Sequence, residues 1–344
     1  MARPGEGGIA RRRIGIASPV SLAAEVEPLV RSGASELYCG VSVESWGRRF
    51  GSLAWLNRRG AGAANPNRMG LERLLAEATR LGVPVGVTLN SPYYTAQQLP
   101  DLVALCGDLQ AAGVARVIVA DPSLIVALRE AGSSLPITAS SVAALRNAGA
   151  LELYRDLGAS RVVLPRHMTV DEVVRIRERV ADLELEVFVL NDGCAYEEGS
   201  CATTHAAGAF CLTEWRWDFA RLDAAPLGDA DREALERNVD DYRDWLWHLA
   251  NCGRSLAPGR LPEGPCGLCA IHAFATAGID CLKVVGREAH PGRKLLSVQL
   301  VRAVVDRIAE GATAEEATAF ARGLRDAPER CDGTFMCYYR PSPA

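Results

Sequence analysis

The stretch RVVLPRHMTVDEVVRIRERVADLELEVFVLN, residues 161–191, decides the fold. Its two ends, Arg161–Arg166 and Glu186–Asn191, are nearly continuous apolar runs, as expected of parallel strands buried on both faces. Between them, Val170–Ala181 has the spacing of an amphipathic helix, and Thr169 is a suitable N-cap. A strand, a helix and a second strand within about 30 residues predict a βαβ unit.

The same unit recurs along the chain. Six further strands are predicted at Arg13–Ala17, Glu36–Val41, Pro84–Asn90, Arg116–Asp121, Pro136–Ser140 and Cys281–Gly286. Further helices are predicted at Leu22–Arg31, Leu71–Leu81, Leu99–Ala112, Ser123–Ala131, Val142–Leu157, Leu295–Ala309 and Ala314–Leu324. Eight strands alternating with helices predict an α/β fold, a (β/α)8 TIM-like barrel. A doubly wound open sheet is the alternative, although no GxGxxG follows the first strand.

The predicted organisation has three parts. Residues 1–12 form a flexible N-terminus, residues 13–311 form the barrel, and residues 312–344 form a C-terminal helix and tail. The barrel includes a cysteine-rich insertion at residues 192–268 between strands seven and eight. About 90 residues lie between these two strands, where a βα unit takes about 30, and a long loop at this end of a barrel is usually functional. A charged helix is expected within it at Asp229–Trp247.

Composition excludes several classes of protein. The 344 residues are 49% hydrophobic and 23% charged, which is ordinary for a globular protein. The net charge of -4 gives no global positive field, so we expect no nucleic-acid partner. No apolar run approaches the ~18 residues of a membrane span, and the N-terminus lacks the apolar core of a secretion signal. We therefore expect a cytoplasmic protein without membrane contact.

Cysteines are the most informative residues of the insertion region. Eleven is an odd number, and a disulfide framework is not expected in a cytoplasmic chain. Cys194, Cys201 and Cys211 follow strand seven, and Cys269 begins a short helix before strand eight. These positions share one end of a barrel, where four thiolates suit zinc or an iron–sulfur cluster. The alternative is that they are buried core residues, as we expect for Cys106. Cys266 and Cys39 are other candidate ligands, and Cys331 and Cys337 form a tail contact, a redox pair or further ligands.

Several segments together resemble a known family. They are ELYCGV (36–41), PVGVTLN (84–90), LGASRVVLPR (157–166), the cysteine loop and GIDCLKVVGR (278–287). The chain resembles peptidase family U32, the collagenase-like peptidases, over about residues 13–290. That family includes anaerobic hydroxylation proteins of ubiquinone synthesis and RNA hydroxylases, some of which use prephenate as the oxygen source. The resemblance implies a [4Fe-4S] cluster on Cys194, Cys201, Cys211 and Cys269.

Polar side chains just past the strand ends are the candidate first contacts for a substrate. They are Ser18, Glu44, Asn90, Asp121, Ser140, His167, Asp192 and Arg287. We predict catalytic roles for Arg287, His167 and Asn90, since arginine can grip a carboxylate and histidine can exchange a proton near neutral pH. Each also has a structural interpretation, as a salt bridge or a hydrogen-bonding residue.

Other residues have two interpretations of the same kind. Lys283 is a core-edge ion-pair partner or a substrate contact, and Arg48 with Arg49 is a second anion site or a surface pair. His205 is a candidate partner of the cluster. Tryptophans 215, 217, 245 and 247 pack the insertion or face an aromatic substrate.

The predicted function is an iron–sulfur protein that catalyses or supports O2-independent hydroxylation of a small organic substrate, with prephenate as a candidate co-substrate. A peptidase or hydrolase is the alternative, and a non-catalytic iron–sulfur scaffold is another. The expected protein partner is a second copy or a related family subunit.

Overall fold

A closed ring of eight parallel strands forms the centre of the molecule. The computed structural model describes residues 14–51, 55–58, 65–194, 198–199, 216–250, 265–334 and 337–339. The strands are β1 (Gly15–Pro19), β2 (Glu36–Cys39), β3 (Val85–Leu89), β4 (Arg116–Val119), β5 (Ile137–Ala139), β6 (Arg161–Val163), β7 (Glu184–Leu190) and β8 (Cys281–Val284). Each strand pairs with the next, and β8 closes on β1 with Leu282 beside Ile16. The predicted (β/α)8 barrel is therefore confirmed.

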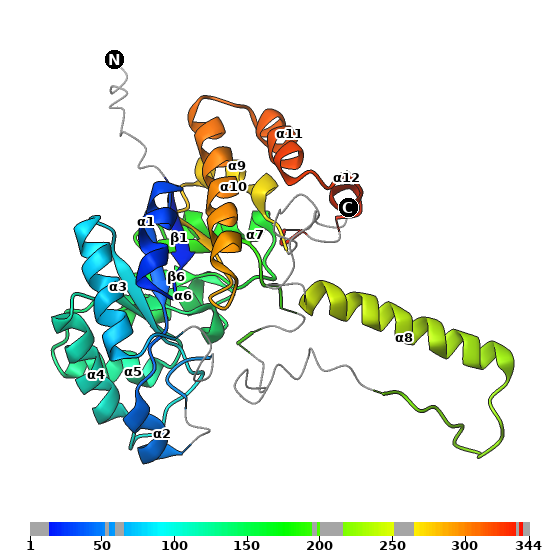
Figure 1. The fold of residues 1–344 in the computed structure, drawn as a ribbon, viewed down its shortest axis with the longest axis horizontal. Helices are drawn as coiled ribbons and strands as arrows, with labels where there is room; N and C mark the ends of the chain where they lie inside the picture. The colour runs from blue at the N-terminus through cyan, green and yellow to red at the C-terminus, as the bar shows by residue number, and fades with distance from the viewer. Residues whose placement is uncertain are drawn as a thin grey trace.

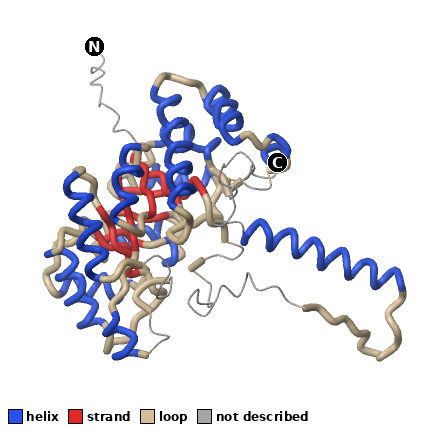
Figure 2. Tube along the Cα trace, in the orientation of Figure 1, coloured by secondary structure: helices blue, strands red, loops and turns tan. Residues whose placement is uncertain are grey.

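Helices surround the strands on the outside (Figures 1 and 2). They are α1 (Ala23–Arg31), α2 (Glu44–Phe50), α3 (Arg68–Arg80), α4 (Leu99–Ala111), α5 (Pro122–Glu130), α6 (Ala148–Asp156), α7 (Val170–Arg179), α8 (Asp229–Ala250), α9 (Ile271–Ala277), α10 (Pro291–Ala309), α11 (Ala314–Arg325) and α12 (Pro328–Asp332). Two short 3-10 helices are η1 (Ser141–Ala143) and η3 (Leu268–Ala270). In the part of the chain that is described, no helix is long and apolar enough to cross a membrane.

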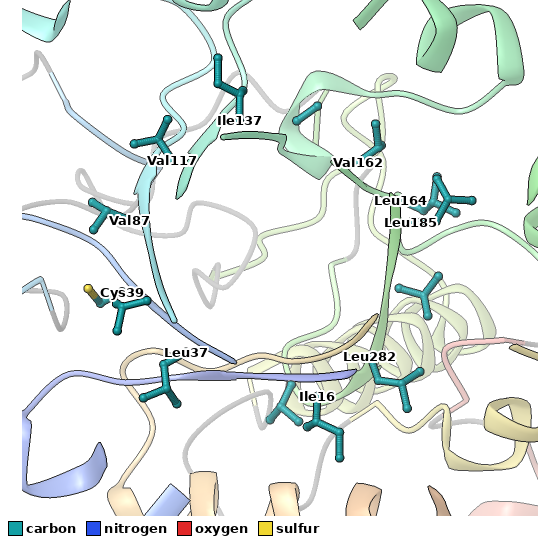
Figure 3. Packing of buried hydrophobic residues seen from close by; sticks show 14 of the residues in the cluster. Ile16, Leu37, Cys39, Val87, Val117, Ile137, Val162, Leu164, Leu185 and Leu282 are labelled. Atoms are coloured by element: carbon teal, nitrogen blue, oxygen red, sulfur yellow. The ribbon is translucent and has the colours of Figure 1, made fainter. Parts of the chain in front are cut away.

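Successive side chains of a strand point to opposite faces, and this alternation divides the core into two parts. One set packs between the ring and the helices, as Figure 3 shows for ten labelled residues: Ile16, Leu37, Cys39, Val87, Val117, Ile137, Val162, Leu164, Leu185 and Leu282. The other set faces the inside of the ring, where the apolar residues form only small clusters. Much of the interior is polar instead.

Charged side chains fill that interior in compensating pairs. Arg161 of β6 reaches Glu36 at 2.7 Å, Glu184 at 2.8 Å and Glu186 at 3.2 Å. Lys283 of β8 makes a salt bridge with Glu186. Although burial raises the pKa of Glu186, the charges of Lys283 and Arg161 outweigh it, and the pKa lies below its usual value. The network ties β2, β6, β7 and β8 together across the ring.

The helix predicted at Val142–Leu157 is wrong in its first part. Residues Ser141–Ala143 form η1, and Ala144 then adopts a left-handed conformation with φ 57°. The α-helix starts only at Ala148, where Asn147 caps it by accepting a hydrogen bond from Ala150 N at 3.0 Å. A local side-chain cap thus competes successfully with the apolar periodicity that suggested one long helix.

Other boundaries differ by smaller amounts. Helix α10 begins at Pro291, four residues before the predicted Leu295, because proline needs no amide partner in a first turn. Helices α2 and α12 are short and were not expected. The Thr169 cap of α7 is confirmed, and it forms a reciprocal capping box with Glu172. The charged helix of the insertion is observed as α8, which projects away from the barrel (Figure 1). The flexible N-terminus predicted at residues 1–12 lies outside the described residues.

Replacing Arg161 by methionine should lower the free energy of unfolding by about 3–5 kcal/mol, because it leaves buried carboxylates without their cation. Urea unfolding followed by circular dichroism measures this change. The matched control is Arg48→Met, which removes an exposed salt bridge to Glu44 and should leave the midpoint unchanged. Equal midpoints for the two variants would contradict a structural role of the interior network.

Candidate functional site at the mouth of the barrel

The carboxyl ends of the strands surround a pocket at the mouth of the barrel. Loops converge at this end of a (β/α)8 barrel, and its enzymes place their chemistry there. The lining residues are Tyr38, Arg58, Thr88, Asn90, Ile118, Ser140, Ser141, Val142, Val163, Arg166, Phe188, Asp192, Gly193, Cys194, Lys283, Val285, Gly286 and Arg287. Of the eight candidate first contacts, the mouth gathers Asn90, Ser140, Asp192 and Arg287.

Cationic side chains outnumber carboxylates in this lining. The cations are Arg58, Arg166, Lys283 and Arg287, and the carboxylate is Asp192. Arg287 Nη1 donates to Thr88 Oγ1 at 2.7 Å and to Asn65 Oδ1 at 3.3 Å, and these hydrogen bonds help to orient its guanidinium. A guanidinium fork matches a carboxylate in charge and shape. The mouth is therefore suited to a small anion that carries carboxylates.

Buried carboxylates behind the pocket orient two of these cations. Lys283 pairs with Glu186 and lies 3.9 Å over the ring of Tyr38. Arg166 pairs with Glu198, and its guanidinium lies 3.9 Å over the ring of Phe188. The ion-pair interpretation of Lys283 is thus confirmed. Arg166 was not singled out in the sequence, although it stands just past a strand end like the candidates that were.

Asn90 connects two strand ends at the mouth. Its side-chain nitrogen donates to Ser140 Oγ at 3.1 Å, and its side-chain oxygen accepts from Arg58 N at 3.2 Å. Arg58 in turn donates to the backbone oxygen of Glu198 at 2.7 Å. The amide of Asn90 therefore holds the loop that carries Arg58 against the β3 and β5 ends. Arg58 lies in a loop between α2 and α3, where no sequence signal marks it.

A cysteine–histidine pair stands at the edge of the pocket. His167 follows β6, is exposed, and makes a hydrogen bond with Cys194 after β7. Burial alone would raise the pKa of the Cys194 thiol, but the hydrogen bond with His167 and the charges of Arg166 and Arg58 lower it below its usual value. No local pattern predicts this pair, because its two members lie 27 positions apart.

The remaining candidate contacts lie away from the mouth. Ser18 is buried in β1, and Asp121 caps α5 by accepting from Ser123 N at 2.8 Å. Glu44 lies in α2 and pairs with Arg48, while Arg49 lies 2.9 Å from Asp101. Arg48 and Arg49 are therefore members of surface salt bridges. Trp217 is half exposed and stacks on Phe219 at 6.2 Å. His205 and Trp215 lie outside the described residues.

The described cysteines of the implied cluster do not meet in one cavity. Cys194 lines the mouth, whereas Cys269 lines a second cavity that shares no lining residue with it. Cys201 and Cys211 lie outside the described residues, so a cluster on this set stays a prediction. Among the residues that are described, no group of three or more His, Cys, Asp or Glu could hold a metal ion as placed.

Two other cysteines belong to the core. Cys39 and Cys106 are buried, and burial raises the pKa of each to about 12. Both lie among apolar side chains that pack between the ring and its helices. Core packing is therefore the interpretation that holds for both, and Cys39 does not line the mouth.

The fold and the site together define a (β/α)8 barrel protein with a cationic pocket at the catalytic end. The sequence profile of peptidase family U32 matches residues 22–343, and the chain belongs to this family.

Curated relatives match parts of this chain. It is 29% identical to tRNA hydroxylation protein P1 of Bacillus subtilis (strain 168) over 67% of this chain and 51% of that protein. It is 27% identical to tRNA hydroxylation protein P of Escherichia coli (strain K12) over 44% of this chain and 35% of that protein. The solved U32 peptidase Mk0906 aligns with a TM-score of 0.43 and 18% identity, over 54% of this chain and 72% of that one. The chain thus spans about half or less of the length of these curated relatives.

Replacing Arg287 by methionine should weaken binding of a small dicarboxylate such as malonate by about tenfold or more, because a hydrogen-bonded ion pair is lost. Isothermal titration calorimetry measures the affinity. Arg287→Lys keeps the charge but loses the bidentate guanidinium, so its affinity for malonate should lie between those of the parent and of Arg287→Met. Arg48→Met, on exposed α2, should bind malonate like the parent. Undiminished affinity in Arg287→Met would rule out this residue as the anion contact.

Proposed function

We propose that this chain catalyses or supports O2-independent hydroxylation at the mouth of the barrel, with a base of tRNA as the acceptor. The cationic mouth at the catalytic end of the barrel carries this proposal. The family and the names of two curated relatives, both called tRNA hydroxylation proteins, support it. The tRNA acceptor replaces the small organic substrate expected from the sequence, and it runs against our expectation of no nucleic-acid partner from the net charge.

The co-substrate that the mouth fits is a small carboxylate such as prephenate. Replacing C–H by C–OH removes two electrons from the base and adds one oxygen atom. The hydroxyl oxygen of prephenate is at the oxidation level of water, so a separate two-electron acceptor, such as an oxidised electron-transfer protein, has to be reduced. Arg287 offers a fork for one carboxylate, and Thr88 holds that fork in place. Prephenate carries two carboxylates. Lys283 and Arg166, each paired with a buried glutamate, belong to the same lining and are the candidate contacts of the second.

Asn90 and His167 have a positioning role and a proton-transfer role in this proposal. Asn90 holds the loop of Arg58, so that both residues line the pocket. His167 can accept or deliver a proton at the pocket edge through a ring nitrogen, because the free imidazole titrates near neutral pH. An iron–sulfur cluster, when bound, supplies the route by which electrons leave. The resemblance implies Cys194, Cys201, Cys211 and Cys269 as its ligands.

The proposal includes a protein partner, because the resemblance to the U32 family implies one. This partner is a second copy of the chain, which gives a homo-oligomer, or a related family subunit.

The test is an anaerobic assay with reconstituted protein, prephenate, an artificial electron acceptor and tRNA that lacks hydroxylated bases. Nucleoside mass spectrometry should find one added oxygen atom in a base, and Arg287→Met should abolish it while Arg48→Met retains it. A parallel arm offers free aromatic acceptors in place of tRNA. Hydroxylation in that arm alone would refute the tRNA acceptor, and no product in either arm would refute the hydroxylase.

A peptidase is the second candidate, and one observation favours it. The hydrogen bond between Cys194 and His167 has the form of a nucleophile with its base. Peptide hydrolysis by the metal-free protein that disappears in Cys194→Ala would support this activity. Hydrolysis that persists in Cys194→Ala would remove Cys194 from it.

A further inference from the structure

A second cavity, of about 210 Å³, is lined by four cysteines. Cys266 and Cys269 come from the segment around η3, Cys331 from α12, and Cys337 from the tail. No disulfide joins any two of these four cysteines. The cavity is more than tenfold larger than the ~15 Å³ that one water needs. The four cysteines therefore line a space that can hold a group larger than a water molecule.

Backbone pairing brings these distant segments together. The backbone of Cys266 forms isolated β-bridges with Leu190 at the end of β7 and with Cys337 of the tail. Tyr338 N donates to Cys266 O at 2.9 Å, and Gly267 N donates to Val189 O at 2.7 Å. A Cβ at Gly267 would lie 2.9 Å from the ring of Tyr339, so the tail needs glycine here. The fold thus specifies this meeting of cysteines.

A buried cation marks the cavity as a site for an anion. Arg325 of α11 lines it and is only 5% exposed. Burying a guanidinium costs free energy, and an anionic occupant of the cavity would offset that cost. Arg322, which also lines the cavity, pairs at the rim with Asp332.

We infer that Cys266, Cys269, Cys331 and Cys337 hold an iron–sulfur cluster of the [4Fe-4S] type. Four thiolates are its ordinary ligand set, and the assembly carries a net negative charge that Arg325 faces. A single zinc ion fits less well, because it needs its ligands at about 2.3 Å from one point. The described residues contain no group placed for one ion, whereas these four surround a cavity.

This assignment disagrees with the ligand set that the family resemblance implies. Cys269 is the only residue in both sets, and the structure places it with Cys266, Cys331 and Cys337 rather than with Cys194. Assembly releases the protons of the four thiols and takes up iron and sulfide. The inference does not depend on hydroxylation, since it concerns which thiols hold the cluster.

The test measures iron, acid-labile sulfide and zinc in the full chain after anaerobic reconstitution. Cys266→Ser, Cys331→Ser and Cys337→Ser should each lose about four iron and four sulfide per chain. The matched variants Cys201→Ser and Cys211→Ser should keep those four. Circular dichroism of the metal-free proteins separates loss of cluster from loss of fold, and Cys331→Ser in the half-buried α12 is the mildest change.

A second measurement uses the buried arginine. Arg325→Leu should shift the reduction potential of the cluster to a more negative value, since the nearby cation favours the reduced form. Arg302→Leu, on α10 in a pair with Asp306, should leave the potential unchanged. Stoichiometric zinc, a Cys331–Cys337 disulfide in the isolated protein, or full iron content in Cys331→Ser would each overturn the inference. Failure of the hydroxylation assay with the iron count intact would affect only the proposed function.

Discussion

The structure depends on charge compensation inside the closed ring of strands. Arg161 and Lys283 share Glu186, and Arg161 also reaches Glu36, so cations and carboxylates alternate across the interior. A barrel interior is more often packed with branched apolar side chains. Here the ion network supports the mouth from below, because Lys283 belongs to both. Lys283, one of the cations in the pocket lining, is thus held in place by its salt bridge with Glu186 of the interior network.

The end of β7 lies beside both cavities. On one side Phe188 lines the mouth, where it stacks on Tyr338 at 6.4 Å. On the other side Tyr339 lines the cysteine cavity and donates to Phe188 O at 2.8 Å. Two aromatic residues of the tail therefore separate the cavities. A cluster in the cysteine cavity would lie next to Tyr339, whose hydroxyl donates to the backbone of Phe188 in the lining of the mouth.

Local patterns predicted most of the fold, and half of the eight predicted substrate contacts line the mouth. Apolar runs placed all eight strands, and the position past a strand end identified Asn90 and Arg287. The same rule placed Glu44 wrongly, because α2 begins there and turns it to solvent. The Cys194–His167 pair and the cysteine cavity depend on tertiary contacts between distant segments. The sequence analysis grouped Cys269 with Cys194. In the structure, backbone pairing of Cys266 with the tail brings Cys269 and Cys337 into the lining of one cavity.

The most direct measurement is a crystal structure of the anaerobically reconstituted protein with anomalous data at the iron edge. We expect an iron peak among Cys266, Cys269, Cys331 and Cys337, next to Tyr339 and outside the mouth. A single iron peak bounded by both Cys194 and Cys269, with Cys331 and Cys337 unligated, would contradict it.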